Sequence, residues 1–191
     1  MRLPPPYRQE QDAGRQGVMR RLRHWGEIHS QIQAKVAALG KQIKRDYKGK
    51  YLLLLGTLKG AVPFIADLAR AIDLPLEIDY MAISSYGNTT HSSGVVRILK
   101  DLEGPIDQKH VLIVEDIVDS GLTLHYQMDV LRQRHPLSLR VCALLDKDRE
   151  RIKVVNLDYT GFQIPNRRCS IHIFHVPIRC KSKHYFQLKY R

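Results

Sequence analysis

The chain has 191 residues, of which 43% are hydrophobic and 26% are charged, and this composition is typical of a soluble protein with one globular domain. Its apolar runs are too short for a transmembrane helix, and its arginine-containing N-terminus lacks the apolar segment of a secretory signal peptide. The three cysteines, Cys142, Cys169 and Cys180, fit a reducing cytosol better than a disulfide framework, so we expect a cytoplasmic protein without a membrane partner.

The net charge of +12 is concentrated toward the C-terminus. Seven of the 31 Lys and Arg residues, and none of the 19 Asp and Glu residues, lie in residues 167–191, which leaves residues 1–166 with a net charge of +5. A mildly basic body attracts phosphorylated small molecules, but the same sign would attract nucleic acid. The charge alone therefore does not separate these two classes of partner.

Composition divides the chain into three segments. Residues 1–20 contain three consecutive prolines, several Gln and Arg and few apolar residues, which predicts a disordered extension; Met19 offers an alternative start of translation. Residues 21–166 have the alternating apolar and polar stretches of a folded domain. Residues 167–191 form a basic tail without acidic residues.

The predicted elements of the folded domain begin with a helix, because apolar residues recur there every three or four positions. Those residues are Ile28, Ile32, Val36, Leu39 and Ile43. Five short apolar strands are predicted after this helix. They cover residues 51–55, 77–84, 95–99, 111–115 and 140–145.

Two further helices are predicted between these strands. One covers residues 62–72 and ends at Asp73-Leu74-Pro75, and the other follows the strand 111–115, with Leu124, Met128 and Leu131 as its apolar positions. Residues 87–94 are small and polar and indicate a mobile loop. Strands that alternate with helices predict an α/β fold with a parallel sheet.

The most informative stretch is residues 111–123, where an apolar strand leads into Glu115, Asp116 and Asp119. Ligands of open α/β sheets bind at the carboxyl ends of the strands, which is where these acids fall. A carboxylate only accepts hydrogen bonds, so Glu115 and Asp116 suit the hydroxyl groups of a ribose.

The turn that follows these acids suits a phosphate group. It reads Asp119-Ser120-Gly121-Leu122-Thr123 and leads into a helix, whose first N–H groups and dipole favour an anion. The hydroxyl groups of Ser120 and Thr123 add further donors. The combination of ribose acids and phosphate turn indicates a sugar phosphate as ligand.

The chain resembles the type I phosphoribosyltransferases, and is most similar to their hypoxanthine/guanine branch. Residues 111–123 resemble the phosphoribosyl pyrophosphate motif, and four shorter matches place the resemblance over roughly residues 28–166. They are Leu55-Gly56-Thr57-Leu58-Lys59-Gly60, Ser84-Ser85-Tyr86-Gly87, Leu144-Leu145-Asp146-Lys147 and Gly161-Phe162-Gln163-Ile164-Pro165.

The resemblance implies a fold, a reaction and partners. The fold would be a parallel sheet of about five strands with helices on both faces and a small hood. The reaction would be purine salvage, in which the 5-phosphoribosyl group moves from phosphoribosyl pyrophosphate to hypoxanthine or guanine, giving IMP or GMP and pyrophosphate. The family further implies Mg²⁺ and a homo-oligomer, a dimer or tetramer.

The resemblance also implies roles for the phosphate- and ribose-binding residues. Glu115 and Asp116 would bind the ribose and share Mg²⁺ with the pyrophosphate. Ser120, Gly121, Leu122 and Thr123 would bind the 5′-phosphate. The pyrophosphate loop would contain Leu58, Lys59 and Gly60, with a cis peptide between Leu58 and Lys59.

Three further roles concern the reacting base. Asp119 would take the purine N7 proton as N9 attacks the ribose, although an Asp at this position could instead cap the following helix. Lys147 would donate to the O6 of a 6-oxopurine, or be an ordinary surface lysine. Ser85 and Tyr86 would close over the site and exclude water, or belong to a plain polar loop.

The resemblance stops after Asn166. The family continues with an aromatic residue that stacks on the purine and an aspartate near the metal, but this chain places Arg168 and His175 near those positions. Three explanations stay open: a frameshift, a real replacement that makes a basic surface, and a metal site. The metal site would use Cys169, His172, His175, Cys180 and His184, whose spacing matches no common zinc pattern.

Within the same fold, the alternative is a phosphoribosyltransferase for another 6-oxopurine or for a pyrimidine base. An alternative from another class is a regulatory or RNA-binding relative that keeps the fold and loses catalysis. The acid-free tail would then contact phosphates. We consider nucleic acid the less favoured partner.

Overall fold

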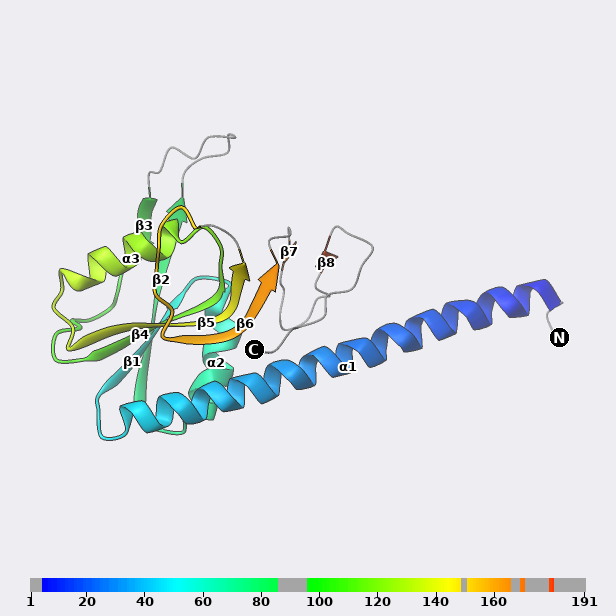
Figure 1. Cartoon of the computed structure of the whole chain (residues 1–191), viewed down its shortest axis with the longest axis horizontal. Helices are drawn as coiled ribbons and strands as arrows, with labels where there is room; N and C mark the ends of the chain where they lie inside the picture. The colour runs from blue at the N-terminus through cyan, green and yellow to red at the C-terminus, as the bar shows by residue number, and fades with distance from the viewer. Residues whose placement is uncertain (1–4, 86–95, 149–150, 166–168, 171–178, 181–191) are drawn as a thin grey trace. The chain divides into compact units, whose positions relative to one another are not determined.

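The computed structural model describes residues 5–85, 96–148, 151–165, 169–170 and 179–180 (Figure 1), with side chains described for residues 26–84, 97–147 and 151–164. The chain divides into two units, residues 1–35 and 36–191. No helix in the described part of the chain is long and apolar enough to span a membrane.

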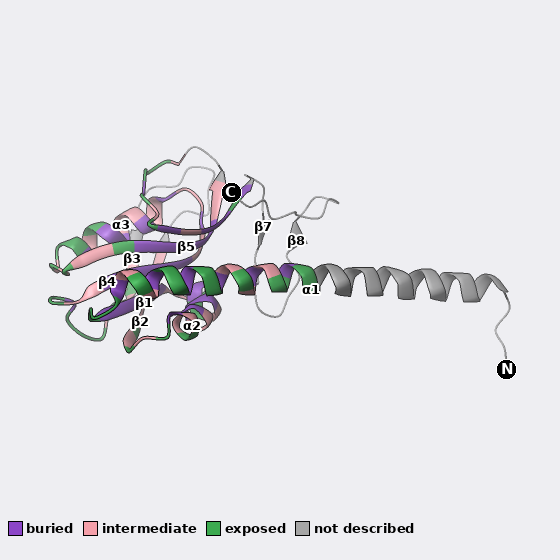
Figure 2. Cartoon of the chain, turned by 60° about the horizontal axis from the view of Figure 1, so that its bottom comes forward, coloured by how far each residue is buried: buried purple, intermediate pink, exposed green. Residues whose placement is uncertain are grey.

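Helix α1 (Pro5–Tyr47) includes residues 5–20, for which the sequence predicted a disordered extension. Pro5 and Pro6 stand in its first turn, where proline is tolerated, and the Gln, Arg and Glu residues that follow are good helix formers. The predicted apolar positions of α1 are buried. Figure 2 shows buried (purple) stretches alternating with exposed (green) ones along the described side chains of α1. Their exposed fractions are 8%, 8%, 2%, 4% and 0% for Ile28, Ile32, Val36, Leu39 and Ile43.

The second unit contains the remaining elements. They are β1 (Leu52–Thr57), α2 (Ala61–Ile72), β2 (Leu76–Ser85), β3 (Val96–Lys100), β4 (His110–Val118), α3 (Leu122–Arg132), β5 (Ser138–Asp148), β6 (Tyr159–Pro165), β7 (Cys169–Ser170) and β8 (Arg179–Cys180).

The main sheet has six strands in the order β3-β2-β1-β4-β5-β6. Strands β2, β1, β4, β5 and β6 are parallel, and β3 pairs antiparallel with β2 at one edge. The predicted α/β fold is confirmed, and so is the returning strand near residues 95–99. The five predicted strands are β1, β2, β4 and β5, which are parallel, and the antiparallel β3; the parallel strand β6 was not predicted.

Helices cover both faces of the sheet (Figure 1). Leu53, Leu55 and Val111 belong to a core cluster with Leu124 and Met128 of α3. Successive residues of a strand point to opposite faces, so Leu52 and Leu54 point to the other face. On that side a Cβ added at Gly56 would lie 3.2 Å from Ile65 of α2. This layering explains why β1 and β4 consist of unbroken apolar runs.

The tail contributes a separate two-stranded antiparallel sheet, in which Cys169 is the register partner of Cys180. The side chains of the tail lie outside the described residues, and so does the predicted loop 87–94. The hood, the basic surface and the metal site of the tail therefore stay predictions.

Candidate functional site

The carboxyl ends of β1 and β4 and the first turn of α3 enclose a pocket of about 200 Å³. It contains the predicted phosphate turn and one of the two predicted ribose acids. Its lining residues are Thr57, Glu115, Ile117, Val118, Asp119, Ser120, Gly121, Thr123 and Leu124.

The phosphate turn connects β4 to α3 with a left-handed glycine. Gly121 has a φ of 78° and is the N-cap residue of α3, and its carbonyl accepts the first helical hydrogen bond, from the N–H of His125 at 2.9 Å. Glycine adopts this conformation without steric cost. The N-cap position of α3 is thus Gly121 and not Asp119.

Glu115 is 9% exposed and points toward the face that α3 covers. The hydroxyl of Thr57 donates to its Oε1 and also lies 3.3 Å from Oε1 of the buried Gln127. The pKa of Glu115 is raised to about 8, chiefly by burial; the hydrogen bond from Thr57 opposes this shift and the neighbouring Asp116 adds to it. A pKa of about 8 favours the neutral form of the Glu115 carboxyl at pH 7 when no ligand is bound.

Asp116 points to the opposite face, as expected for the next residue of a strand. A Cβ added at Gly60 would lie 2.5 Å from Asp116 Oδ2, so the carboxylate rests against the loop between β1 and α2 and leaves no room for a side chain there. Burial raises the pKa of Asp116, although backbone N–H groups of Asp116 and Ile117 lower it. The two predicted ribose acids thus reach the carboxyl edge from different faces of the sheet.

The loop that carries Gly60 has the expected backbone. The peptide between Leu58 and Lys59 is cis, which confirms the prediction from the resemblance. The N–H of Leu58 donates to the carbonyl of Met81 at 2.8 Å, which fixes the loop to β2. Lys59 and Gly60 are exposed beside the first turn of α2.

Lys147, near the end of β5, contacts Asp119. Its Nζ lies 2.5 Å from Asp119 Oδ2, and its side chain is 10% exposed whereas that of Asp119 is 44% exposed. Such burial does not fit the alternative of an ordinary surface lysine. The predicted acid–base residue and the predicted purine ligand therefore lie together.

Ser85 ends β2, and its side chain is not described. Tyr86 lies outside the described residues, so the predicted closing pair is not placed as a pair. Sequence reasoning missed Thr57 and Gln127 as site residues. Thr57 stood within a matched motif, whereas no sequence signal marked Gln127.

The donor set suits a hard cation that substrate oxygens help to hold. The part of the chain with described side chains contains no cluster of three or more His, Cys, Asp or Glu residues that could bind a metal. Mg²⁺ commonly uses one or two carboxylates together with substrate phosphates. Glu115 and Asp116 at one sheet edge supply two such carboxylates.

Comparisons with known proteins agree with this geometry. A phosphoribosyl transferase domain model matches residues 24–183. The hypoxanthine-guanine phosphoribosyltransferase of Mycobacterium avium is 56% identical over 142 residues, which are 71% of this chain and 70% of that protein. The Bacillus subtilis protein of the same name is 46% identical over 136 residues, 71% of this chain and 76% of that protein.

A solved structure is similar as well. The crystal structure of a hypoxanthine phosphoribosyltransferase from Staphylococcus aureus has a TM-score of 0.71 and 41% identity. The match covers 74% of this chain and 77% of that chain.

Proposed function

We infer that this chain, which belongs to the phosphoribosyltransferase family, is a hypoxanthine-guanine phosphoribosyltransferase of purine salvage. It transfers the 5-phosphoribosyl group of phosphoribosyl pyrophosphate to N9 of hypoxanthine or guanine and releases pyrophosphate. The arrangement at the carboxyl end of β4 is the structural observation that supports this function most directly. There Glu115, the phosphate turn and the Asp119–Lys147 pair lie together.

The 5′-phosphate binds in the turn before α3. The backbone N–H groups of Ser120, Gly121, Leu122 and Thr123 and the hydroxyls of Ser120 and Thr123 are available as donors, and the helix dipole favours the dianion. The pocket volume of about 200 Å³ leaves space for this group. Anchoring the phosphate holds C1 of the ribose at a fixed place, which removes motion that would otherwise oppose transfer.

Glu115 and Asp116 bind the ribose hydroxyls, and with pyrophosphate oxygens they would hold Mg²⁺. The cation supplies positive charge that stabilises the leaving pyrophosphate. Leu58, Lys59 and Gly60 form the loop that receives the pyrophosphate, next to Asp116. Thr57, which bonds Glu115, keeps that carboxyl oriented toward the pocket.

Asp119 and Lys147 act on the base. As N9 attacks C1, the bond from C1 to the pyrophosphate oxygen breaks, and the carboxylate of Asp119 receives the proton from N7. Lys147 donates to O6 and cannot accept from an amino group, which disfavours adenine. Ser85 and Tyr86 would close over the centre and exclude water, which would otherwise intercept the ribosyl cation.

The oligomeric state and the tail are further parts of this proposal. We expect a dimer or tetramer, which analytical ultracentrifugation would measure. If residues 167–191 lack the stacking aromatic, base affinity should be weak by roughly 1–3 kcal/mol, the value of base–aromatic stacking elsewhere. A chimera with a family hood after Asn166 should then improve the KM for hypoxanthine by about tenfold.

The decisive experiment follows IMP formation from hypoxanthine and phosphoribosyl pyrophosphate with and without Mg²⁺. We expect turnover only with the cation. Saturable RNA binding without turnover would reject the enzyme and favour the RNA-binding relative.

A further inference from the structure

The connection between β5 and β6 contacts the turn that we assign to the 5′-phosphate. The backbone N–H of Lys153 donates to the carbonyl of Ser120 at 3.2 Å. A Cβ added at Gly121 would lie 2.3 Å from the carbonyl oxygen of Lys153, so the two backbones meet without space for a side chain. Residues 151–155, which we name the bracing segment, therefore support the phosphate turn from outside the pocket.

The bracing segment is also part of the core beneath the turn. Val155 is 6% exposed and belongs to the same apolar cluster as Val118 and Leu124. Val118 and Leu124 line the pocket. A shift of the bracing segment would therefore change the packing of the pocket wall.

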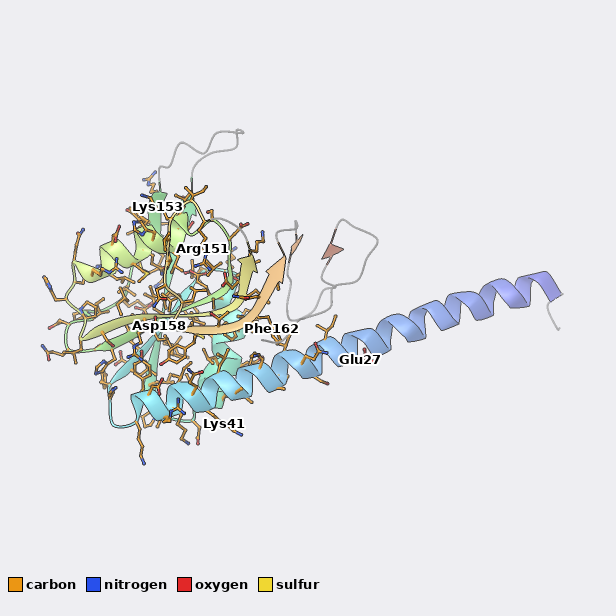
Figure 3. The ribbon with its side chains drawn as sticks, in the orientation of Figure 1. Glu27, Lys41, Arg151, Lys153, Asp158 and Phe162 are labelled. Atoms are coloured by element: carbon orange, nitrogen blue, oxygen red, sulfur yellow. The ribbon has the colours of Figure 1, made fainter. Side chains whose placement is uncertain are left out.

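Arg151 ties the bracing segment to the end of β5. Its Nη2 forms an ion pair with Asp146, and its Nη1 donates to the carbonyl of Val155 at 2.7 Å. The side chains of Arg151 and Asp146 are only 15% and 17% exposed, so water and salt screen this pair less than a surface pair. Figure 3 labels Arg151 and Lys153 on this connection.

These contacts form a circuit, a series of linked residues that leads from the bracing segment through the end of β5 and the phosphate turn back to the bracing segment. Asp146 precedes Lys147 in β5, and the Nζ of Lys147 lies 2.5 Å from Asp119. Asp119 precedes Ser120, which returns the circuit to the bracing segment. The two side-chain links of Arg151, to Asp146 and to the carbonyl of Val155, involve neither the phosphate turn nor the two residues assigned to the base.

We propose that Arg151 is a positioning residue that holds the phosphate turn and Lys147 at the separation needed for transfer. It acts through Asp146 on the strand end and through the bracing segment on the turn. The proposal rests on the proposed function, because it assigns the 5′-phosphate to the turn and the purine to Lys147. An error of about 1 Å in such a placement can lower a rate roughly 10²-fold.

The test compares Arg151→Gln with the parent enzyme. We expect the KM values for phosphoribosyl pyrophosphate and hypoxanthine each to rise at least about tenfold, because both subsites lose their common support. Arg151→Lys should be intermediate, since an ammonium keeps the charge but lacks the planar fork that reaches two acceptors. Arg132→Gln is the matched control, because Arg132 pairs with Asp129 on α3 and is 56% exposed.

Two readouts separate positioning from mere stability. A purely structural role would lower the melting temperature and the fraction of active enzyme, and hence the apparent kcat, without changing either KM. Asp146→Asn should raise the same two KM values, and the double variant should be no worse than Arg151→Gln, because Arg151→Gln already removes the pair with Asp146. KM values within about threefold of the parent, or additive effects, would overturn the proposal.

A phosphate titration keeps this test separate from the proposed function. If the parent enzyme does not convert hypoxanthine, the proposed function fails. Calorimetry with inorganic phosphate alone then decides the inference: about tenfold weaker binding to Arg151→Gln supports it, and equal binding to both proteins overturns it.

Discussion

The acids at the amino edge of the sheet differ in their partners from Glu115 and Asp116 at the carboxyl edge. At the amino edge, where the strands begin, acids are paired. The Oη of Tyr159 donates to Asp46 at 2.9 Å and accepts from Arg140 at 3.2 Å, and Lys109 lies 2.6 Å from Glu77. At the carboxyl edge, no ion pair among the described residues involves Glu115 or Asp116.

The pKa values of these acids are shifted in opposite directions at the two edges. The hydroxyl of Tyr159 holds the pKa of Asp46 below its usual value, and Lys109 and Tyr51 do so for Glu77. Burial instead raises the pKa values of Glu115 and Asp116. The paired acids of the amino edge thus contribute to stability. The carboxyl edge also contains two ion pairs, Asp119–Lys147 and Asp146–Arg151, but keeps Glu115 and Asp116 without an ion-pair partner among the described residues, as expected for groups that bind a ligand.

The largest expected effect is at Asp119. Asp119→Asn should lower kcat by roughly 10²–10⁴, the range for a lost general base, while phosphoribosyl pyrophosphate still binds. Asn keeps the size of the side chain, and steady-state kinetics with calorimetry measures both quantities. Turnover within about threefold of the parent would show that Asp119 has a structural role only.

The next effect concerns the ribose acids. Replacing Glu115 and Asp116 together with Ala should weaken Mg²⁺-dependent binding of phosphoribosyl pyrophosphate, because each charged hydrogen bond contributes roughly 1.5–3 kcal/mol. Isothermal titration calorimetry gives the affinity, with Glu77→Ala at the amino edge as control. Equal affinity of the double variant and the parent would reject the ribose assignment.

A smaller effect is expected on the stability of the empty protein. The folded pKa of Glu115, about 8, exceeds its ordinary value of 4.5, so between these values the folded state keeps a proton that the unfolded state loses. Glu115 therefore makes the fold less stable as pH rises through this window. Glu115→Gln should be more stable than the parent by an amount that grows from pH 5 to pH 8, at about 1.4 kcal/mol for each unit of pKa shift.

Urea unfolding at several pH values measures this difference. A constant difference between the two proteins from pH 5 to pH 8 would contradict the raised pKa of Glu115.

The smallest effect belongs to the amino edge. Tyr159→Phe removes the hydroxyl between Asp46 and Arg140, which should reduce the free energy of unfolding by about 1 kcal/mol at pH 7. Because Asp46 has a lowered pKa, the loss should shrink as pH falls through that pKa and the carboxyl becomes protonated. The kinetic constants should not change. A loss of turnover at constant stability would contradict the claim that the amino edge serves stability and not catalysis.

Most of the fold was predictable because the sequence signal for each helix or strand lies within the residues of that element. The buried strands β1, β4 and β5 each contain an apolar run, and the helix residues Leu124, Met128 and Leu131 repeat at helical spacing. Strand β6, which has no such run, was not predicted. The network of Thr57, Glu115 and Gln127 was not predictable, since only the folded sheet brings these distant residues together.

The opposite directions of Glu115 and Asp116 follow from strand alternation, because β4 continues through both acids to Val118. The predicted strand stopped at Glu115, so this consequence was not drawn. Residues 5–20 show the limit of composition, which predicted a disordered extension where the structure has the first part of α1.

Proton release on ligand binding tests most directly the claim that the carboxyl edge keeps its charge for the ligand. The heat of binding phosphoribosyl pyrophosphate with Mg²⁺ at pH 7 would be measured in buffers of different ionisation enthalpy, for the parent and Glu115→Gln. The parent should release more protons than the variant, by a number that approaches one, because a neutral Glu115 ionises when ribose hydroxyls and a cation favour its charged form. Equal proton release by the two proteins would contradict the account.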